Sequence, residues 1–166
     1  MNYKYYSFLL LICLVFTIEG QAQAQVPTRK LEAIYMYNFT KYINWQRAGG
    51  QGHTIGVWEE SEVATELQDN LKNKGGIVVK MISTAAEVKE CEIVYLPKTK
   101  SAQLSQLMTA AGSDVLIVTE EDLAAKGASV SFVQDGSKLR FKINQGALDK
   151  AGLQASSSLL SLAILL

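Results

Sequence analysis

The sequence predicts a single three-layer α/β domain: a mostly parallel sheet flanked by helices, a C-terminal antiparallel hairpin and two closing helices. Three observations indicate this class. Strand and helix patterns alternate between about residues 54 and 119, as in parallel sheets covered on both sides. The segment "DVLIVT" (114–119) is apolar almost throughout, which favours a strand buried on both faces. The segment "ASVSFVQDGSKLRFKIN" (128–144) then alternates apolar and polar residues around Asp135-Gly136, which predicts a hairpin.

The N-terminal segment has the features of a secretory signal peptide. "MNYKYYS" carries one lysine, and the apolar run from Phe8 is shorter than the roughly 20 residues that span a bilayer. Ala22 and Ala24 are small residues at the positions that signal peptidase reads. An uncleaved membrane anchor is the alternative interpretation. We expect residues 1–24 to be a signal peptide and residues 25–166 to form one exported α/β domain.

The expected elements follow from hydrophobic periodicity and from turn residues. The parallel strands are expected at 54–58, 76–82, 92–96 and 114–119. The helices around them are expected at about 28–45, 61–74, 84–89 and 101–111. Ser61 is a plausible N-cap, and Gly112 is expected to end its helix in a left-handed cap.

The C-terminal segment "NQGALDKAGLQASSSLLSLAILL" (144–166) predicts two short helices rather than one. Gly152 can cap the first helix, with Leu153 folding back as its hydrophobic partner. Ser156 or Ser157 can cap the second helix.

Composition excludes two classes of protein. Cys91 is the only cysteine after the predicted signal peptide, so this is not a small disulfide-stapled fold. The chain has 16 basic and 16 acidic residues and no basic run after the signal peptide, which argues against a nucleic acid partner.

The residues that catalysis requires do not converge in any recognisable motif. His53 is the only histidine and lies in a Gly-rich connection. The sequence holds no G-x-S-x-G, no phosphate-binding loop motif and no Cys/His cluster with zinc-ligand spacing. Glu59, Glu60 and Glu62 follow the first strand and would repel a phosphate at the edge of the sheet where such folds bind ligands. We therefore expect no catalytic residue, metal or cofactor.

The first helix carries more aromatic residues than packing against one sheet requires. A helical projection groups its apolar side chains on one broad face, made by Leu31, Ile34, Tyr35, Asn38, Tyr42 and Trp45 and extended by Met36, Phe39 and Ile43. Asn38 lies near the centre of that face, so we expect it to be buried and to hydrogen-bond Ser156 or Ser157.

Part of the same helix is a candidate partner-binding surface. Tyr37 points away from the apolar face and Lys41 flanks it; with Tyr42 and Trp45 they are the candidate partner-binding residues. The polar edge of the hairpin is a second candidate surface, for a partner or for another copy of the chain in a homodimer.

The two ends of the exported chain resemble the motifs of the YfiR family. "YNFTKYINW" (37–45), which includes Asn38 and Phe39, is similar to the opening motif of the family. "FKINQGALDKAGLQASSSLLSLA" (141–163) is similar to its closing motif. The matching positions of the closing motif include Phe141, Asn144, Gly152, Ser156 and Ser157.

This resemblance implies a periplasmic repressor that acts by binding and not by catalysis. Such a repressor holds an inner-membrane diguanylate cyclase inactive by contacting its periplasmic sensory domain. An outer-membrane-associated protein can draw the repressor away, which raises cyclic-di-GMP and favours biofilm. A membrane histidine kinase is an alternative partner.

The chain departs from the family pattern at three positions. Family repressors use cysteine pairs, one of them at the position of Cys91, but this chain has no second cysteine after the signal peptide, which argues against redox control. Gln46 replaces the usual proline, and Ala155 replaces a larger aliphatic residue. A small-molecule binding module that feeds a membrane kinase or transporter is the alternative function, with the crevice at the carboxyl edge of the sheet as its site. An exported enzyme is the third interpretation.

Overall fold

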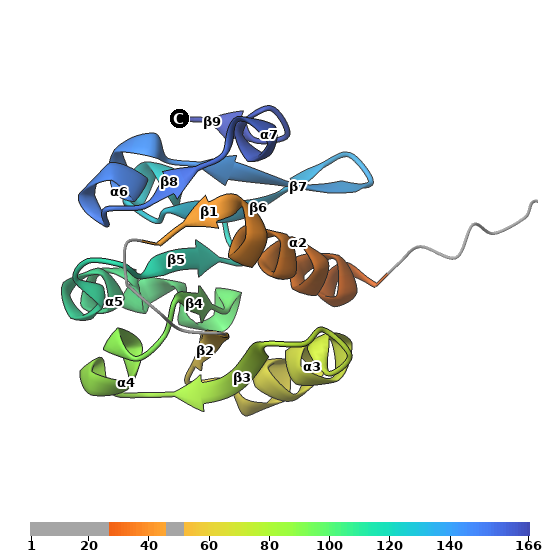
Figure 1. The fold of residues 1–166 in the computed structure, drawn as a ribbon, viewed down its shortest axis with the longest axis vertical. Coiled ribbons are helices and arrows are strands. Elements are labelled where there is room, and N and C mark those ends of the chain that lie inside the picture. Colours follow the sequence, from red (N-terminus) through yellow and green to blue (C-terminus); the bar gives the residue numbers. More distant parts are fainter. Residues whose placement is uncertain (1–26, 46–51) are drawn as a thin grey trace, which may run out of the picture.

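Strands and helices alternate along the chain in the order that the sequence predicts (Figure 1). The computed structural model describes residues 27–45 and 52–166. The predicted signal peptide and most of the Gly-rich connection lie outside these residues.

The helices are α2 (Thr28–Tyr42), α3 (Ser61–Leu71), α4 (Ala85–Lys89), α5 (Leu104–Ala111), α6 (Gln145–Lys150), α7 (Ser157–Leu160) and the 3-10 helices η1 (Lys98–Gln103) and η2 (Ala124–Lys126). The strands are β1 (Ile43–Asn44), β2 (His53–Trp58), β3 (Ile77–Ile82), β4 (Ile93–Leu96), β5 (Leu116–Thr119), β6 (Val130–Asp135), β7 (Lys138–Ile143), β8 (Gln154–Ala155) and β9 (Ile164–Leu165).

The main sheet has seven strands in the order β3-β2-β4-β5-β6-β7-β9. Strands β3 to β6 are parallel to one another, and β7 is antiparallel to β6. The predicted mostly parallel sheet and its hairpin are therefore confirmed. The hairpin was expected to form the edge of the sheet. This expectation is wrong beside Lys142 and Ile143, because the short strand β9 pairs in parallel with these residues of β7.

Two cores lie on opposite faces of the sheet. Alternate residues of β4 divide between them: Ile93 and Tyr95 face the core under α2 and α3, and Val94 and Leu96 face the core under α4 and α5. Strand β5 divides in the same way and is buried at all four positions, as the apolar run "DVLIVT" predicts. Helices α6 and α7 contribute Leu148 and Leu159 to the first core, so both faces are covered.

Several predicted caps are present and two are not. The N–H of Leu153 donates to the carbonyl of Leu148 at 2.9 Å while Gly152 has φ 71°, which confirms the predicted C-terminal cap of α6. Ser156 accepts from the N–H of Leu159 and caps α7. Ser61, however, is the first residue of α3, whose N-cap position is Glu60. Gly112 has φ 65° but ψ −142°, so it is not a left-handed helical cap.

The two ends of the domain contact each other, as the paired end motifs suggest. Helix α2 stops at Tyr42 rather than Trp45, because Ile43 adopts an extended conformation and pairs with Ala155. Asn44 pairs with Gln154, and the N–H of Ser156 donates to the carbonyl of Tyr42 at 2.8 Å. We call this β1–β8 contact, with the Ser156–Tyr42 hydrogen bond, the terminal clasp.

Candidate functional site

Helix α2 buries a different face from the one that the sequence predicts. Ala33, Met36, Phe39 and Ile43 are buried, whereas the predicted centre of the apolar face, Asn38, is only half-buried. The buried residues recur at helical spacing on the far side of the helix from Asn38. The ring of Phe39 decides the orientation, because it packs 5.3 Å from the ring of Phe141 and 6.3 Å from that of Phe132.

The predicted hydrogen bond between Asn38 and the closing serines is wrong. Among the residues that the structure describes, Asn38 makes no hydrogen bond with Ser156 or Ser157. The Ser156 hydroxyl accepts from the N–H of Leu159 at 3.2 Å, and Ser157 is exposed. Backbone pairing in the terminal clasp therefore joins the two end motifs, and a buried amide does not.

Because α2 buries the face that carries Phe39, some apolar side chains on its other side are exposed to solvent. Ile34 is 42% exposed and Tyr42 is 45% exposed. At the end of the chain, beyond α7, Leu162 and Leu165 are 65% and 50% exposed. Helix α2 contacts α7, whereas Leu165 lies on β9, which pairs with β7. We call Ile34, Tyr37, Lys41 and Tyr42, which are accessible side chains of α2, the terminal surface.

Three of the four candidate partner-binding residues are accessible on this surface. The Lys41 ammonium lies 4.3 Å from the centre of the Tyr37 ring, and that of Lys74 lies 5.1 Å from it. The hydrogen bond with Lys41 lowers the pKa of Tyr37. Tyr42 and Lys41 are exposed, and Tyr37 is half-buried.

Trp45, the fourth candidate, has structural contacts. Its indole N–H donates to the carbonyl of Glu92 at 3.3 Å, and its ring lies 5.0 Å from that of His53. It is half-buried and packs against the first core. The tryptophan of the opening motif thus holds β1 to the main body of the domain.

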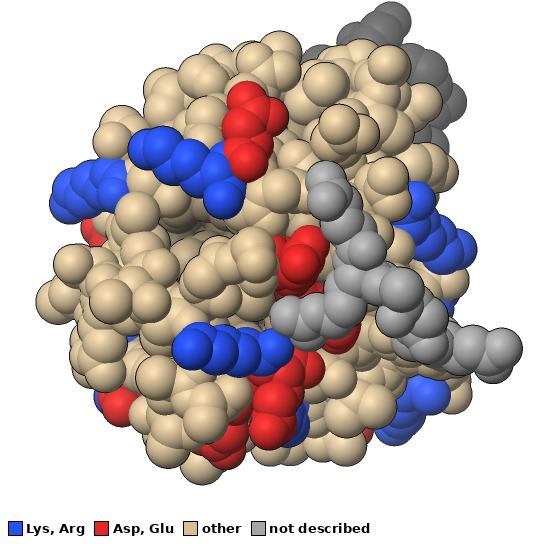
Figure 2. All heavy atoms as spheres, turned by 60° about the vertical axis from the view of Figure 1, so that its left-hand side comes forward, with Lys and Arg blue, Asp and Glu red and all other residues tan. Residues whose placement is uncertain are grey.

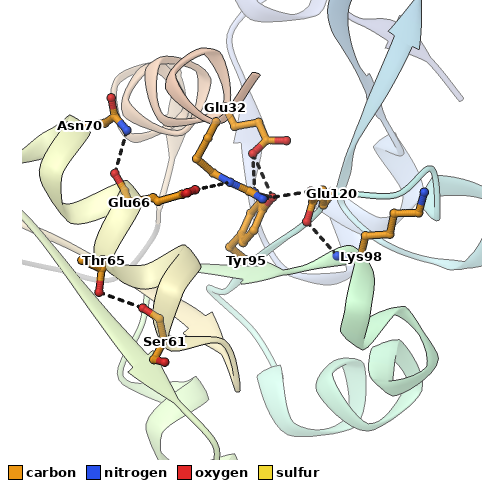
Figure 3. A network of polar contacts seen from close by, with 9 residues as sticks. Glu32, Ser61, Thr65, Glu66, Asn70, Tyr95, Lys98 and Glu120 are labelled. Atoms are coloured by element: carbon orange, nitrogen blue, oxygen red, sulfur yellow. Dashed lines mark hydrogen bonds and ion pairs between the residues drawn. The ribbon is translucent and has the colours of Figure 1, made fainter. Parts of the chain in front are cut away.

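A second polar site lies at the carboxyl edge of the sheet, where α/β folds bind ligands. Figure 3 shows Glu32, Glu66, Tyr95 and Glu120 converging from α2, α3, β4 and the end of β5. The Arg29 guanidinium joins them. It donates to Glu32 at 2.7 Å, to Glu66 and Glu120 at 3.1 Å, and to the hydroxyl of Tyr95. We call these five residues the Arg29 cluster.

Burial governs the electrostatics of the cluster. Burial raises the pKa of Glu32 to about 7, although the Arg29 charge opposes this shift. Burial also raises the pKa of Tyr95, so its hydroxyl remains a neutral donor and donates to Glu32 at 3.1 Å.

A hollow of about 610 Å³ opens beside the cluster, and Glu60, Glu62 and Lys98 share its lining with Arg29, Glu66 and Glu120. The lining therefore carries both signs of charge, with acidic residues in excess. That Glu60 and Glu62 disfavour phosphate binding at this edge of the sheet stays a prediction.

Sequence reasoning did not find the Arg29 cluster. Glu32 is 2% exposed near the start of an aromatic helix, and Tyr95 carries the one hydroxyl of the strand "IVYL". The sequence offered one signal of this cluster, a carboxylate and a phenol at positions expected to be buried. Buried polar groups need hydrogen-bond partners, so these two residues indicated a polar contact.

The cysteine is not placed for thiol chemistry. Cys91 is free and fully buried, and burial raises its pKa to about 11. Over the described part of the chain, no group of three or more His, Cys, Asp or Glu residues could hold a metal ion. Within the same residues, no helix is long and apolar enough to cross a membrane.

Charged side chains are mixed on the face that carries α4, α5 and α6. Figure 2 shows basic and acidic groups side by side on this face, with most of the surface contributed by other residues. The described residues of this face form no continuous basic surface of the kind that binds nucleic acid.

The fold and its sites define a class: a three-layer α/β domain with an exposed terminal surface and a polar hollow at the carboxyl edge of its sheet. Within that class, the chain belongs to the YfiR/HmsC-like family, whose model matches residues 29–164. This is a family of periplasmic regulators rather than of enzymes. The comparison with curated proteins found no match.

Similar folds occur among solved structures. One is the crystal structure of the ABC domain in complex with L-Trp from Streptococcus pneumonia, which matches with a TM-score of 0.62 and 14% identity. The match covers 80% of this chain and 59% of that one, so the chain spans less than two thirds of that domain. At this identity the similarity concerns the fold alone.

Proposed function

We propose that the protein is a periplasmic signalling modulator that binds the periplasmic sensory domain of an inner-membrane diguanylate cyclase and restrains it. Membership of the YfiR/HmsC-like family supports this function. The observation that carries the proposal is the orientation of α2. Ile34 and Tyr42 lie outside the buried core, at 42% and 45% exposed, and Tyr42 adjoins the terminal clasp.

The terminal surface is suited to a protein partner. Tyrosines dominate the binding energy of interfaces when they enter a pocket of the partner, and truncating them costs about 2 kcal/mol or more at the best sites. Tyr42 is 45% exposed, and its backbone is fixed by the hydrogen bond from Ser156. Lys41 adds a positive charge at the rim, which would favour an acidic patch on the sensory domain.

The test is binding to membranes and then to a purified partner domain. The exported chain is used to capture membrane proteins, and the sensory domain recovered is expressed separately for affinity measurement. Tyr42→Ala should weaken binding about 30-fold, which corresponds to roughly 2 kcal/mol. Val78→Ala is the matched control, because Val78 is 60% exposed on β3 at the opposite edge of the sheet.

The control variant should bind within about threefold of the wild type. Equal losses in both variants would contradict the assigned surface. Failure to recover any membrane sensor protein from cells grown under several conditions would contradict the function itself.

A second function, small-molecule binding, is favoured by the hollow at the carboxyl edge. Its lining of Arg29, Lys98 and glutamates offers partners for both charges of a zwitterion. The pneumococcal domain of similar fold is described in complex with such a molecule, L-Trp. A thermal-shift screen of free amino acids tests this function, since a specific ligand raises the melting temperature by mass action. Lys98→Ala should remove a true shift, and no shift at millimolar ligand would refute the function.

A further inference from the structure

In the Arg29 cluster, one guanidinium forms ion pairs with three carboxylates. Arg29 forms ion pairs with Glu32 at 2.7 Å, Glu66 at 3.1 Å and Glu120 at 3.1 Å. When all three are ionised, negative charges outnumber the positive charge by two. These carboxylates repel one another across a single shared cation.

Solvent screens these carboxylates unequally. The Glu66 side chain is 59% exposed and that of Glu120 is 25% exposed, so water stabilises both charges. The Glu32 side chain is 2% exposed. A proton added to Glu32 therefore removes the least solvated charge and leaves Arg29 paired with the other two.

The groups that face Glu32 from its neighbours do not compensate for this burial. Strand β4 contributes the neutral hydroxyl of Tyr95, which donates to Glu32 at 3.1 Å. The end of β5 contributes Glu120 and α3 contributes Glu66, which are both acidic. The backbone N–H of Lys98 donates to Glu120 at 2.9 Å and not to Glu32. Arg29, on the same helix, is the one cation that contacts Glu32 within the described part of the cluster.

We propose that Glu32 is a proton-responsive group that holds the N-terminal part of α2 more tightly against the sheet when it is protonated than when it is ionised. Burial raises the pKa of Glu32 from its ordinary value of 4.5 to about 7, which agrees with this geometry. Because the folded state binds this proton more tightly than the unfolded state, the contribution of Glu32 to stability is full below pH 4.5. It is lost as the pH rises to about 7.

The consequence for regulation rests on the proposed function, because α2 also carries the terminal surface. A rise in external pH would loosen the helix that presents Tyr42 to the partner. The experiments use the exported chain without any partner, so their outcomes do not depend on partner binding.

The experiment is urea denaturation from pH 4.5 to 8.5 on the wild type and two variants. Glu32→Gln mimics the protonated state at every pH. Glu66→Gln is the matched control, because it removes an exposed carboxylate from the same guanidinium. The ratio of the folding constants of Glu32→Gln and the wild type isolates Glu32 from the other titrating groups.

That ratio should rise with pH by up to about 300-fold, since each pKa unit is tenfold in the equilibrium constant. The corresponding ratio for Glu66→Gln should change by less than about threefold, because an exposed ion pair contributes little. A ratio for Glu32→Gln that is independent of pH, or equal changes in both variants, would overturn the proposal.

A direct titration covers the case in which Glu32→Gln does not fold. Carbon-detected NMR of the wild type should show one glutamate side-chain carboxyl titrating above pH 6. The protection of the α2 amides from hydrogen exchange, relative to the intrinsic rate at each pH, should fall through the same range. If every glutamate carboxyl titrates below pH 5, Glu32 is ionised at neutral pH and the inference is wrong.

Discussion

The orientation of α2 can be tested with two truncations to alanine on opposite sides of the helix. Phe39 is fully buried, and its ring contacts those of Phe141 and Phe132. Removing a buried phenylalanine ring costs about 3–5 kcal/mol, to which the lost aromatic pairs contribute about 0.5–1.5 kcal/mol each. We expect Phe39→Ala to lower the free energy of unfolding by about 4 kcal/mol.

Ile34→Ala is the comparison, because Ile34 is 42% exposed one turn and a half earlier on the same helix. A substitution at such a position should cost less than about 1 kcal/mol. Both variants keep a good helix former, so differences in helix propensity are small.

Urea denaturation followed by circular dichroism measures both free energies. With a slope near 2 kcal/mol/M, Phe39→Ala should shift the midpoint down by about 2 M, and Ile34→Ala by less than about 0.5 M. The reasoning is refuted if Ile34→Ala loses as much stability as Phe39→Ala. That result would mean that the face centred near Asn38 is the buried one, as the periodicity of the sequence first indicates.

Three further predictions concern single positions in the body of the domain. Gly152→Ala should destabilise by about 1–2 kcal/mol, because an alanine at φ 71° carries the left-handed penalty; calorimetry checks this. Gly56→Ala should cost about 1–3 kcal/mol in urea denaturation. Its added Cβ would lie 2.7 Å from Cys91 Sγ and 2.6 Å from Ile82 Cδ1. Cys91 is buried with its pKa raised to about 11, so thiol reagents at pH 8 should label native protein more than about 100-fold slower than urea-unfolded protein.

The fold class was predictable because each local pattern agrees with the global arrangement. The run "DVLIVT" is buried on both faces of the sheet, and the alternation around Asp135-Gly136 becomes the β6–β7 hairpin. The terminal elements were harder to predict. β1 and β9 have two residues each, and a pair of residues has no period to detect.

The buried face of α2 could not be read from the sequence because the helix is apolar nearly all round. A projection of hydrophobicity weighs Ile34 and Tyr42 like Phe39, but only Phe39 meets a pocket lined by Phe132 and Phe141. Shape complementarity with residues a hundred positions away selects the face.

The Arg29 cluster was missed for a related reason. Its members lie on four elements, and Arg29 and Glu120 are 91 residues apart. No spacing rule connects such positions. The candidate residues Tyr37, Lys41 and Tyr42 could be selected from the sequence, because aromatic residues beyond what a core needs are visible without knowledge of the fold.

Helix α2 is fixed to the domain at both ends, and this bears on how it can act as a binding surface. Its N-terminal part is held to the sheet by the hydrogen bonds of Arg29 and Glu32 with Tyr95, and its last residue by the terminal clasp. A side chain presented on a fixed backbone loses less conformational entropy on binding than one presented on a loop. The Arg29 cluster and the terminal surface lie on the same helix, so the proposed loosening at Glu32 would act on the helix that carries Tyr42. For the proposed function, the closing motif would act indirectly: β8 pairs with β1, and the N–H of Ser156 donates to the carbonyl of Tyr42, which keeps Tyr42 in place.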